Sequence, residues 1–249
     1  MKKSIFLSVI ALIFSAAALF LVYFPCNKNI VRPMVSAPVS SDAIEEILNN
    51  KPEIVVNALQ KYEENMRAQA AAQAKEKLKT STEALNNDPS SPFIGPKDAK
   101  LVLVEFYDYA CHFCHQLYPE LNKVVANNPD VKFVFKPLAF VSPYSDYAGR
   151  AAFAAAKQGK FSELHTAMFT VEGGLNEEVI DDLAAKAGLD MDQFKKDIQS
   201  EEASAAMNSN SNLAGQLQIN GVPTMVFDGD FVQTLSADDI QSKIDAAKK

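Results

Sequence analysis

The sequence contains little cysteine and little positive charge, and each shortage excludes a class of protein. Its 249 residues include three cysteines, too few for a mini-fold held together by disulfides. With three histidines and no second Cys-x-x-Cys pair, the chain also lacks an obvious set of four zinc ligands. The net charge is -7 and the isoelectric point about 5.1, so no clustered basic surface is expected. We therefore expect no metal site and no nucleic-acid partner.

The composition is that of a folded protein, with 48% hydrophobic and 22% charged residues. A chain of this length can bury a sizeable core and has room for one large domain and an accessory segment. We expect a signal anchor or signal peptide over residues 1–30, a linker and helical oligomerisation segment over 31–90, and the main domain over 91–249.

An apolar run near the start, Ile5–Phe24, marks the chain for export or membrane insertion. At about 20 residues it is long enough to span a bilayer, whereas a cleavable signal has a core of about 7–15. Lys2 and Lys3 before it favour a cytoplasmic N-terminus. We expect an uncleaved anchor. The alternative is cleavage near Ala16–Ala18, which would release a soluble exported protein.

Cys26 lies just beyond the apolar run, where bacterial lipoproteins carry their lipid. The bulky residues before it, Tyr23-Phe24-Pro25, do not fit the small-residue pattern that lipidation requires. A leftover cysteine in an exported protein can also cross-link two chains. We expect a free thiol.

The segment from Ser41 to Leu85 is predicted to be mostly helical, after a linker punctuated by Pro33 and Pro38. A narrow, alanine-rich apolar stripe recurs at helical spacing. Its members are Val55, Leu59, Tyr62, Met66, Ala70, Ala74, Leu78 and Leu85. A lone helix cannot bury such a stripe, so it must pack on the main domain or on another copy of the chain. The alternative is a solvated helical spacer.

The most informative stretch is Leu101–Leu121, where an apolar run leads directly into Cys111-His112-Phe113-Cys114. The run is too continuous for a one-sided strand and indicates a central strand covered on both faces, with Glu105 inside it. Helical spacing follows, which places Cys111 at a helix N-terminus and Cys114 one turn later. Unpaired N–H groups there stabilise a reactive thiolate at Cys111, and Cys114 can resolve a mixed disulfide.

Histidines flank the second cysteine of the motif. An imidazolium at His112 or His115 would further stabilise the Cys111 thiolate, which makes the disulfide oxidising. The letters from Cys111 to His115 also match the C-x-x-C-H signal for c-type haem, with His115 as the iron ligand. A c-type cytochrome is therefore an alternative, as are two buried structural cysteines.

Beyond the motif, residues 131–136 read as a second strand and residues 143–217 as five successive helices. His165 sits at helical spacing from apolar residues and is expected to be a packed helix histidine. Gly221-Val222-Pro223-Thr224 then leads into a β-hairpin around Asp228-Gly229 and a final helix that ends near Ala247. Pro223 at the entrance to a strand indicates a special backbone role, either a cis peptide or a trans proline that opens the strand.

Three short motifs together resemble the DsbA type of thioredoxin-fold disulfide oxidoreductases: Val104-Glu105-Phe106, Cys111-His112-Phe113-Cys114 and Gly221-Val222-Pro223-Thr224. The resemblance covers about residues 93–249 and implies an α/β thioredoxin fold with a helical insertion at about 138–218. From Ser41 onward, the chain is also similar to DsbA-like proteins with an N-terminal oligomerisation segment, such as the ScsC group.

The resemblance implies a role for each matching residue. Cys111 corresponds to the attacking cysteine, Cys114 to the resolving cysteine, and Glu105 to a buried acid that relays protons to Cys114. Val222, Pro223 and Thr224 correspond to the cis-proline loop that holds an extended substrate. The pair His112-Phe113 departs from the proline-histidine pair of strongly oxidising members, so the direction of the reaction stays open.

The resemblance implies an enzyme of the bacterial periplasm without a bound cofactor, tethered by Ile5–Phe24, in which electrons pass through the Cys111–Cys114 pair. Its expected partners are exported cysteine-containing proteins and a membrane or soluble redox partner. Because the stripe that contains Leu59 needs a copy of itself, we expect a homo-oligomer, with a dimer favoured, and isomerase activity beside oxidase activity. A non-catalytic envelope binding protein is the further alternative.

Overall fold

The structure is a computed structural model that describes residues 40–233 and 236–249. The expected anchor Ile5–Phe24 and Cys26 lie outside the described residues. The chain divides into two compact units, Met1–Tyr62 and Glu63–Lys249. Within the described ranges, no helix is both long and apolar enough to cross a membrane.

The first unit contributes helix α2 (Ser41–Asn50) and the start of helix α3 (Glu53–Thr80). Lys51 and Pro52 separate the two helices, and a proline is well tolerated at this position because a helix's first N–H groups have no partner within the helix. Large apolar side chains on both helices are exposed. They are Ile44, Ile47, Leu48, Ile54, Val55, Val56, Leu59 and Tyr62.

The second unit is built on a five-stranded sheet with the order β1-β3-β2-β4-β5. The strands are β1 (Phe93–Ile94), β2 (Val102–Tyr107), β3 (Lys132–Pro137), β4 (Thr224–Phe227) and β5 (Asp230–Val232). β2 and β3 are parallel, while β4 is antiparallel to β2. The loops that follow β2 and β3 and the loop that precedes β4 therefore meet at one edge of the sheet.

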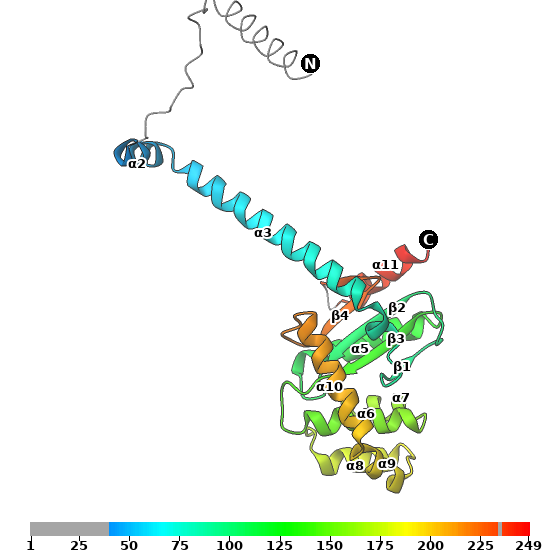
Figure 1. Cartoon of the computed structure of the whole chain (residues 1–249). Coiled ribbons are helices and arrows are strands. Elements are labelled where there is room, and N and C mark those ends of the chain that lie inside the picture. Colours follow the sequence, from blue (N-terminus) through cyan, green and yellow to red (C-terminus); the bar gives the residue numbers. More distant parts are fainter. Residues whose placement is uncertain (1–39, 234–235) are drawn as a thin grey trace, which may run out of the picture. The chain divides into compact units, whose positions relative to one another are not determined.

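Helices fill both the crossover and a long insertion. The crossover from β2 to β3 is α5 (His112–Asn127), and the chain ends in α11 (Ala237–Ala247). Five helices separate β3 from β4, and Figure 1 shows the first four gathered to one side of the sheet. They are α6 (Ser145–Lys157), α7 (Phe161–Thr170), α8 (Glu177–Lys186), α9 (Met191–Ile198) and α10 (Glu201–Gln216).

The side chains of β2 alternate between two hydrophobic clusters, as the period of a strand requires. Leu103 and Tyr107 lie in the cluster formed with α5, α11 and the insertion helices. Val104 and Phe106 lie in the other cluster, together with residues of α10 and the end of the helical segment. The prediction of a strand covered on both faces is confirmed.

The helical segment reaches into the second cluster. Leu78 of α3 and Leu85 of α4 (Thr82–Asn86) are each only 2% exposed and pack with Val104 and Phe106. The segment predicted to be mostly helical up to Leu85 is indeed helical here, but Ser81 separates α3, which ends at Thr80, from α4. The limits of the domains stay a prediction, but the core already includes residues from Leu78 onward.

Both lysines of β3, Lys132 and Lys136, are buried. Nζ of Lys136 donates to Ser91 Oγ at 2.7 Å and lies 3.1 Å from Asp88 Oδ2. Nζ of Lys132 donates to the carbonyl oxygen of Asn86 at 2.6 Å. The two lysines of this strand therefore bind the last residue of α4 and the segment that follows it, and neither faces solvent.

Candidate active site

Cys111 occupies the N-cap position of α5, with extended backbone angles. Its amide donates to the Asp108 carbonyl oxygen at 3.0 Å, and its own carbonyl oxygen accepts from the His115 amide at 3.1 Å. The sulfur therefore lies where the unpaired N–H groups of the first helical turn favour negative charge. This is the placement expected from the sequence.

The loop before β4 faces this cysteine. Because β4 runs antiparallel to β2 and pairs Thr224 with Phe106, the residues before Thr224 lie at the edge where β2 ends. The Val222–Pro223 peptide is cis, which confirms one of the two backbone forms expected there. The Cys111 thiol donates to the Val222 carbonyl oxygen at 3.4 Å, so the two motifs, 111 residues apart, form one site.

Cys114 lies behind Cys111 and is fully buried, while Cys111 is 5% exposed. Both thiols are free in this structure. Burial raises the pKa of the Cys114 thiol well above its usual range, and a backbone hydrogen bond from Asp108 offsets only part of that effect. Both cysteines are buried, but Cys111 keeps a small exposed area while Cys114 has none.

Glu105 lies beneath the pair, in the middle of β2 and 3% exposed. Desolvation raises the pKa of its carboxyl group to about 8, and among the described residues it has no hydrogen-bond or ion-pair partner. Its charge, when present, raises the pKa of Cys114 further. Glu105 is thus protonated at neutral pH and electrostatically coupled to Cys114.

The two residues between the cysteines are exposed. His112 Nε2 lies 3.1 Å from Gln116 Nε2, and the His112 ring contacts the Phe113 ring edge-on at 5.8 Å. Phe113 is 59% exposed, which is unusual for a large aromatic side chain. The motif therefore presents an aromatic surface beside Cys111.

His115 does not fit the role of a haem ligand. Its Nε2 lies 2.8 Å from the Tyr109 carbonyl oxygen and its Nδ1 lies 3.1 Å from the Phe169 carbonyl oxygen. A haem ligand needs one free ring nitrogen directed at the iron. With both nitrogens held by backbone oxygens, His115 instead connects α5 to the end of α7.

His165 is a packed helix histidine, as expected. It is 3% exposed, and its Nδ1 lies 2.8 Å from the Tyr109 hydroxyl, which also accepts from the Tyr107 hydroxyl at 3.0 Å. Desolvation lowers the pKa of His165 to about 3, so the ring is neutral. This polar chain joins the insertion to the end of β2.

The structure reveals a further residue at the site, Asp108, which the sequence reasoning passed over. Its side chain is fully buried between the end of β2 and the loop that follows β3. Oδ1 accepts from the Ala110 amide at 2.8 Å, an arrangement in which an aspartate bonds the backbone two residues on. An aspartate directly after a buried strand and two residues before a turn was the available signal.

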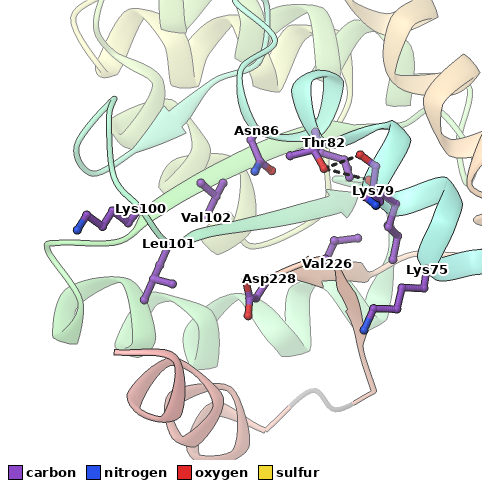
Figure 2. Close-up of a pocket in the computed structure, with 12 residues that line it drawn as sticks. Lys75, Lys79, Thr82, Asn86, Lys100, Leu101, Val102, Val226 and Asp228 are labelled. Carbon is purple, nitrogen blue, oxygen red and sulfur yellow. Dashed lines mark hydrogen bonds between the residues drawn. The ribbon is translucent and has the colours of Figure 1, made fainter. Parts of the chain in front are cut away.

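Two cavities lie at opposite ends of β2. One of about 250 Å3 adjoins the cysteine turn and is lined in part by Ala110, His112 and Tyr144. The other, about 310 Å3, adjoins Leu101 and Val102 at the start of the strand. Figure 2 shows lysine side chains around the second cavity, on α3 and in the loop before β2.

The family model of the DSBA-like thioredoxin domain matches residues 102–245. A thioredoxin-like oxidoreductase from Silicibacter pomeroyi DSS-3 is 32% identical, with a TM-score of 0.63 over 67% of this chain and 96% of that chain. A linker-deletion mutant of Proteus mirabilis ScsC is 28% identical, with a TM-score of 0.68 over 86% of this chain and 100% of that chain.

Curated relatives include proteins named as Na(+)/H(+) antiporters. The relative from Salinispora tropica, named NhaA 3, is 28% identical over 145 residues, which is 57% of this chain. The match spans only 22% of that relative's own length. The similarity to these antiporters thus concerns a segment of each relative and not the whole protein.

Proposed function

The chain belongs to the family of DSBA-like thioredoxin domains, and from that premise we propose that it is a periplasmic thiol:disulfide oxidoreductase acting on exported proteins. Cys111 is the attacking cysteine and Cys114 the resolving cysteine. The observation that carries the proposal is the contact between the Cys111 thiol and the Val222 carbonyl oxygen before the cis proline, at 3.4 Å. In this contact Cys111 Sγ lies beside a partly exposed stretch of backbone.

That edge suits an extended peptide. Val222, Pro223 and Thr224 are partly exposed, and the Val222 carbonyl oxygen is directed at Cys111. A substrate segment that pairs with this backbone would bring its own cysteine to Cys111 independently of its other side chains. Broad specificity for unfolded, cysteine-containing polypeptides follows from recognition of the main chain.

Oxidation of a substrate proceeds in two exchange steps. A substrate thiolate attacks Cys111 Sγ of the Cys111–Cys114 disulfide, forms a mixed disulfide and releases Cys114 as a thiolate. A second substrate thiolate then attacks the substrate sulfur of the mixed disulfide and releases Cys111. Two electrons pass from the substrate to the pair, which a membrane or soluble redox partner resets. No other cofactor is required.

Glu105 supplies the proton that the first step demands. The buried Cys114 thiolate is unstable, because burial raises the pKa of this thiol. Glu105, with its pKa raised to about 8, carries a proton at neutral pH in the same interior. Proton transfer from Glu105 to Cys114 therefore favours attack at Cys111 and stabilises the reduced pair.

Oligomerisation through the helical segment is the second part of the proposal. In the first unit, Leu59 is 57% exposed, Tyr62 62% and Ile47 50%. An exposed apolar surface of this kind is typical of a site that contacts a partner. A symmetric copy offers the same surface, with a dimer favoured. Two active sites near one substrate would support isomerisation as well as oxidation. Tethering by Ile5–Phe24 completes the proposal.

A redox titration of the purified full chain against glutathione tests the activity. We expect two thiols, assigned by mass spectrometry to Cys111 and Cys114, to interconvert with a disulfide as the ratio of reduced to oxidised glutathione changes. A haem Soret band together with a pair that does not titrate would favour a cytochrome and refute the proposal.

A further inference from the structure

The carboxylate of Asp108 accepts four hydrogen bonds. Its Oδ1 accepts from the Ala110 amide at 2.8 Å and from Ser145 Oγ at 2.7 Å. Its Oδ2 accepts from the amides of Phe140 and Val141, at 2.8 and 2.9 Å. One fully buried carboxylate thus joins the active-site turn, the loop after β3 and the start of α6.

The backbone of the same residue holds both cysteines. The Asp108 carbonyl oxygen accepts from the Cys111 amide at 3.0 Å, and a backbone hydrogen bond from Asp108 reaches the Cys114 thiol. The reactive pair and the loop after β3 are therefore connected through one residue.

That loop presents apolar side chains to solvent. Phe140 is 49% exposed and Val141 53%, whereas Leu138, two residues before Phe140, is 1% exposed. The amides of both exposed residues are fixed by Asp108, so the backbone beneath them is held in place. Because β2 and β3 are parallel, the loop leaves the same edge of the sheet as the Cys111 turn.

We propose that Asp108 is a positioning residue that holds Phe140 and Val141 beside Cys111, where they contact apolar side chains near the cysteine of an unfolded polypeptide. This inference rests on the proposed function and adds a determinant of substrate choice. An unfolded chain exposes apolar residues that such a contact buries, while glutathione is too small and polar to use it. Asp108 therefore favours polypeptide thiols over small ones.

The test compares two substrates. The selectivity ratio is kcat/KM for a reduced, unfolded polypeptide divided by kcat/KM for glutathione, measured by stopped flow on the oxidised protein. Asp108→Asn replaces one acceptor oxygen with an NH2 group that cannot accept. The variant loses the hydrogen bond from the Ala110 amide or those from the Phe140 and Val141 amides, and either loss weakens the connection between the turn and the loop. We expect the ratio to fall about tenfold, mainly through KM for the polypeptide, since burying one apolar side chain contributes about that factor.

A double-mutant cycle separates positioning from general damage. Phe140→Ser with Val141→Ser should lower the ratio by a similar factor, and adding Asp108→Asn should lower it no further. If Asp108→Asn does not yield folded protein, Ser145→Ala takes its place in the cycle, because it removes one donor to the same carboxylate. A ratio that Phe140→Ser with Val141→Ser leaves unchanged, or additive losses in the cycle, would overturn the inference.

Asp197→Asn is the matched control. Asp197 is also a buried carboxylate, paired with Lys157 at 2.6 Å within the insertion, and it does not contact the active-site turn. Its substitution should lower stability and leave the selectivity ratio unchanged. If the unmodified protein fails to exchange with glutathione at all, the proposed function itself is wrong. If it exchanges normally and the loop variants do not change the ratio, the inference alone fails.

Discussion

The two compact units differ in how far their large apolar side chains are exposed to solvent. In the unit Met1–Tyr62, Leu59 is 57% exposed and Tyr62 62%, whereas Leu78, on the same helix but in the second unit, is 2% exposed. The second unit buries most of its large apolar side chains within its own hydrophobic core and contains Cys111 and Cys114. The exposed apolar side chains of the first unit are those that the proposed oligomer would bury.

The largest expected effect is that of Cys111→Ala. Removing the attacking sulfur should reduce exchange with an unfolded polypeptide to the uncatalysed rate, both in the full chain and in the fragment 63–249. The assay follows oxidation of a reduced polypeptide by mass spectrometry. Cys26→Ser should retain the activity of the unmodified chain. If Cys111→Ala leaves exchange unchanged, the protein is a binding protein and the division of labour between the units is wrong.

Deleting residues 1–62 should produce a monomer that keeps dithiol oxidation and loses refolding of scrambled ribonuclease. The cut preserves Leu78, Leu85 and Asp88, which a cut at residue 90 would remove from the core. Analytical ultracentrifugation measures the assembly.

A point variant checks the same prediction without a truncation. Leu59→Lys places a charge on the exposed apolar surface and should weaken the oligomer, whereas Gln60→Lys, the neighbouring polar position, should not. A full-length chain that sediments as a monomer at micromolar concentration would contradict oligomerisation through this segment.

A smaller effect concerns Glu105 and depends on pH. The pKa of Glu105 is about 8 in the folded protein and 4.5 for an ordinary glutamate, the value expected in the unfolded chain. Between these pH values the folded state binds more protons than the unfolded state, so the protein loses stability as the pH rises. Across this range the unfolding free energy should fall by about 5 kcal/mol. Glu105→Gln should remove this part of the pH dependence and slow the formation of the mixed disulfide. Urea unfolding at pH 5 and pH 8 measures the pH dependence of the unfolding free energy. If this free energy falls equally between the two pH values in Glu105→Gln and in the unmodified protein, the prediction is refuted.

The smallest effect compares two ion pairs of the second unit. Asp88→Ala leaves the fully buried Lys136 ammonium without its carboxylate and should cost about 3 kcal/mol of unfolding free energy. Asp230→Ala breaks the exposed pair with Lys75 and should cost less than about 1 kcal/mol. If the two substitutions lower the unfolding free energy equally, the segment after α4 is not part of the core. The core of the second unit would then begin closer to residue 90.

The sequence was sufficient for the parts of the site that depend on local pattern. A continuous apolar run predicted the central strand β2, helical spacing placed Cys111 at the start of α5, and a proline at a strand entrance indicated the special backbone at Val222–Pro223. Each of these features arises from residues that are neighbours in the chain. The resemblance to the DsbA type then predicted that the loop at Val222–Pro223 acts together with the distant cysteine motif, and the two are in contact.

Features that depend on distant contacts were not predictable. The position of Asp108 after a strand was a local signal, but its partners Phe140, Val141 and Ser145 follow only after the whole of α5 and β3. The burial of Lys136 depends on Asp88, which lies 48 residues earlier. Strand β1 is two residues long and exists only because β3 pairs with it, so it leaves no periodic signal.

Trapping of the mixed disulfide tests the proposed chemistry most directly. In Cys114→Ala the resolving thiol is absent, so attack by Cys111 on a polypeptide disulfide should stop at the covalent adduct. Incubation with an oxidised, unfolded polypeptide, followed by alkylation and peptide mass spectrometry, should identify a disulfide between Cys111 and a substrate cysteine. An adduct that forms only through Cys26, or no adduct at all, would contradict the assignment of Cys111 as the attacking residue.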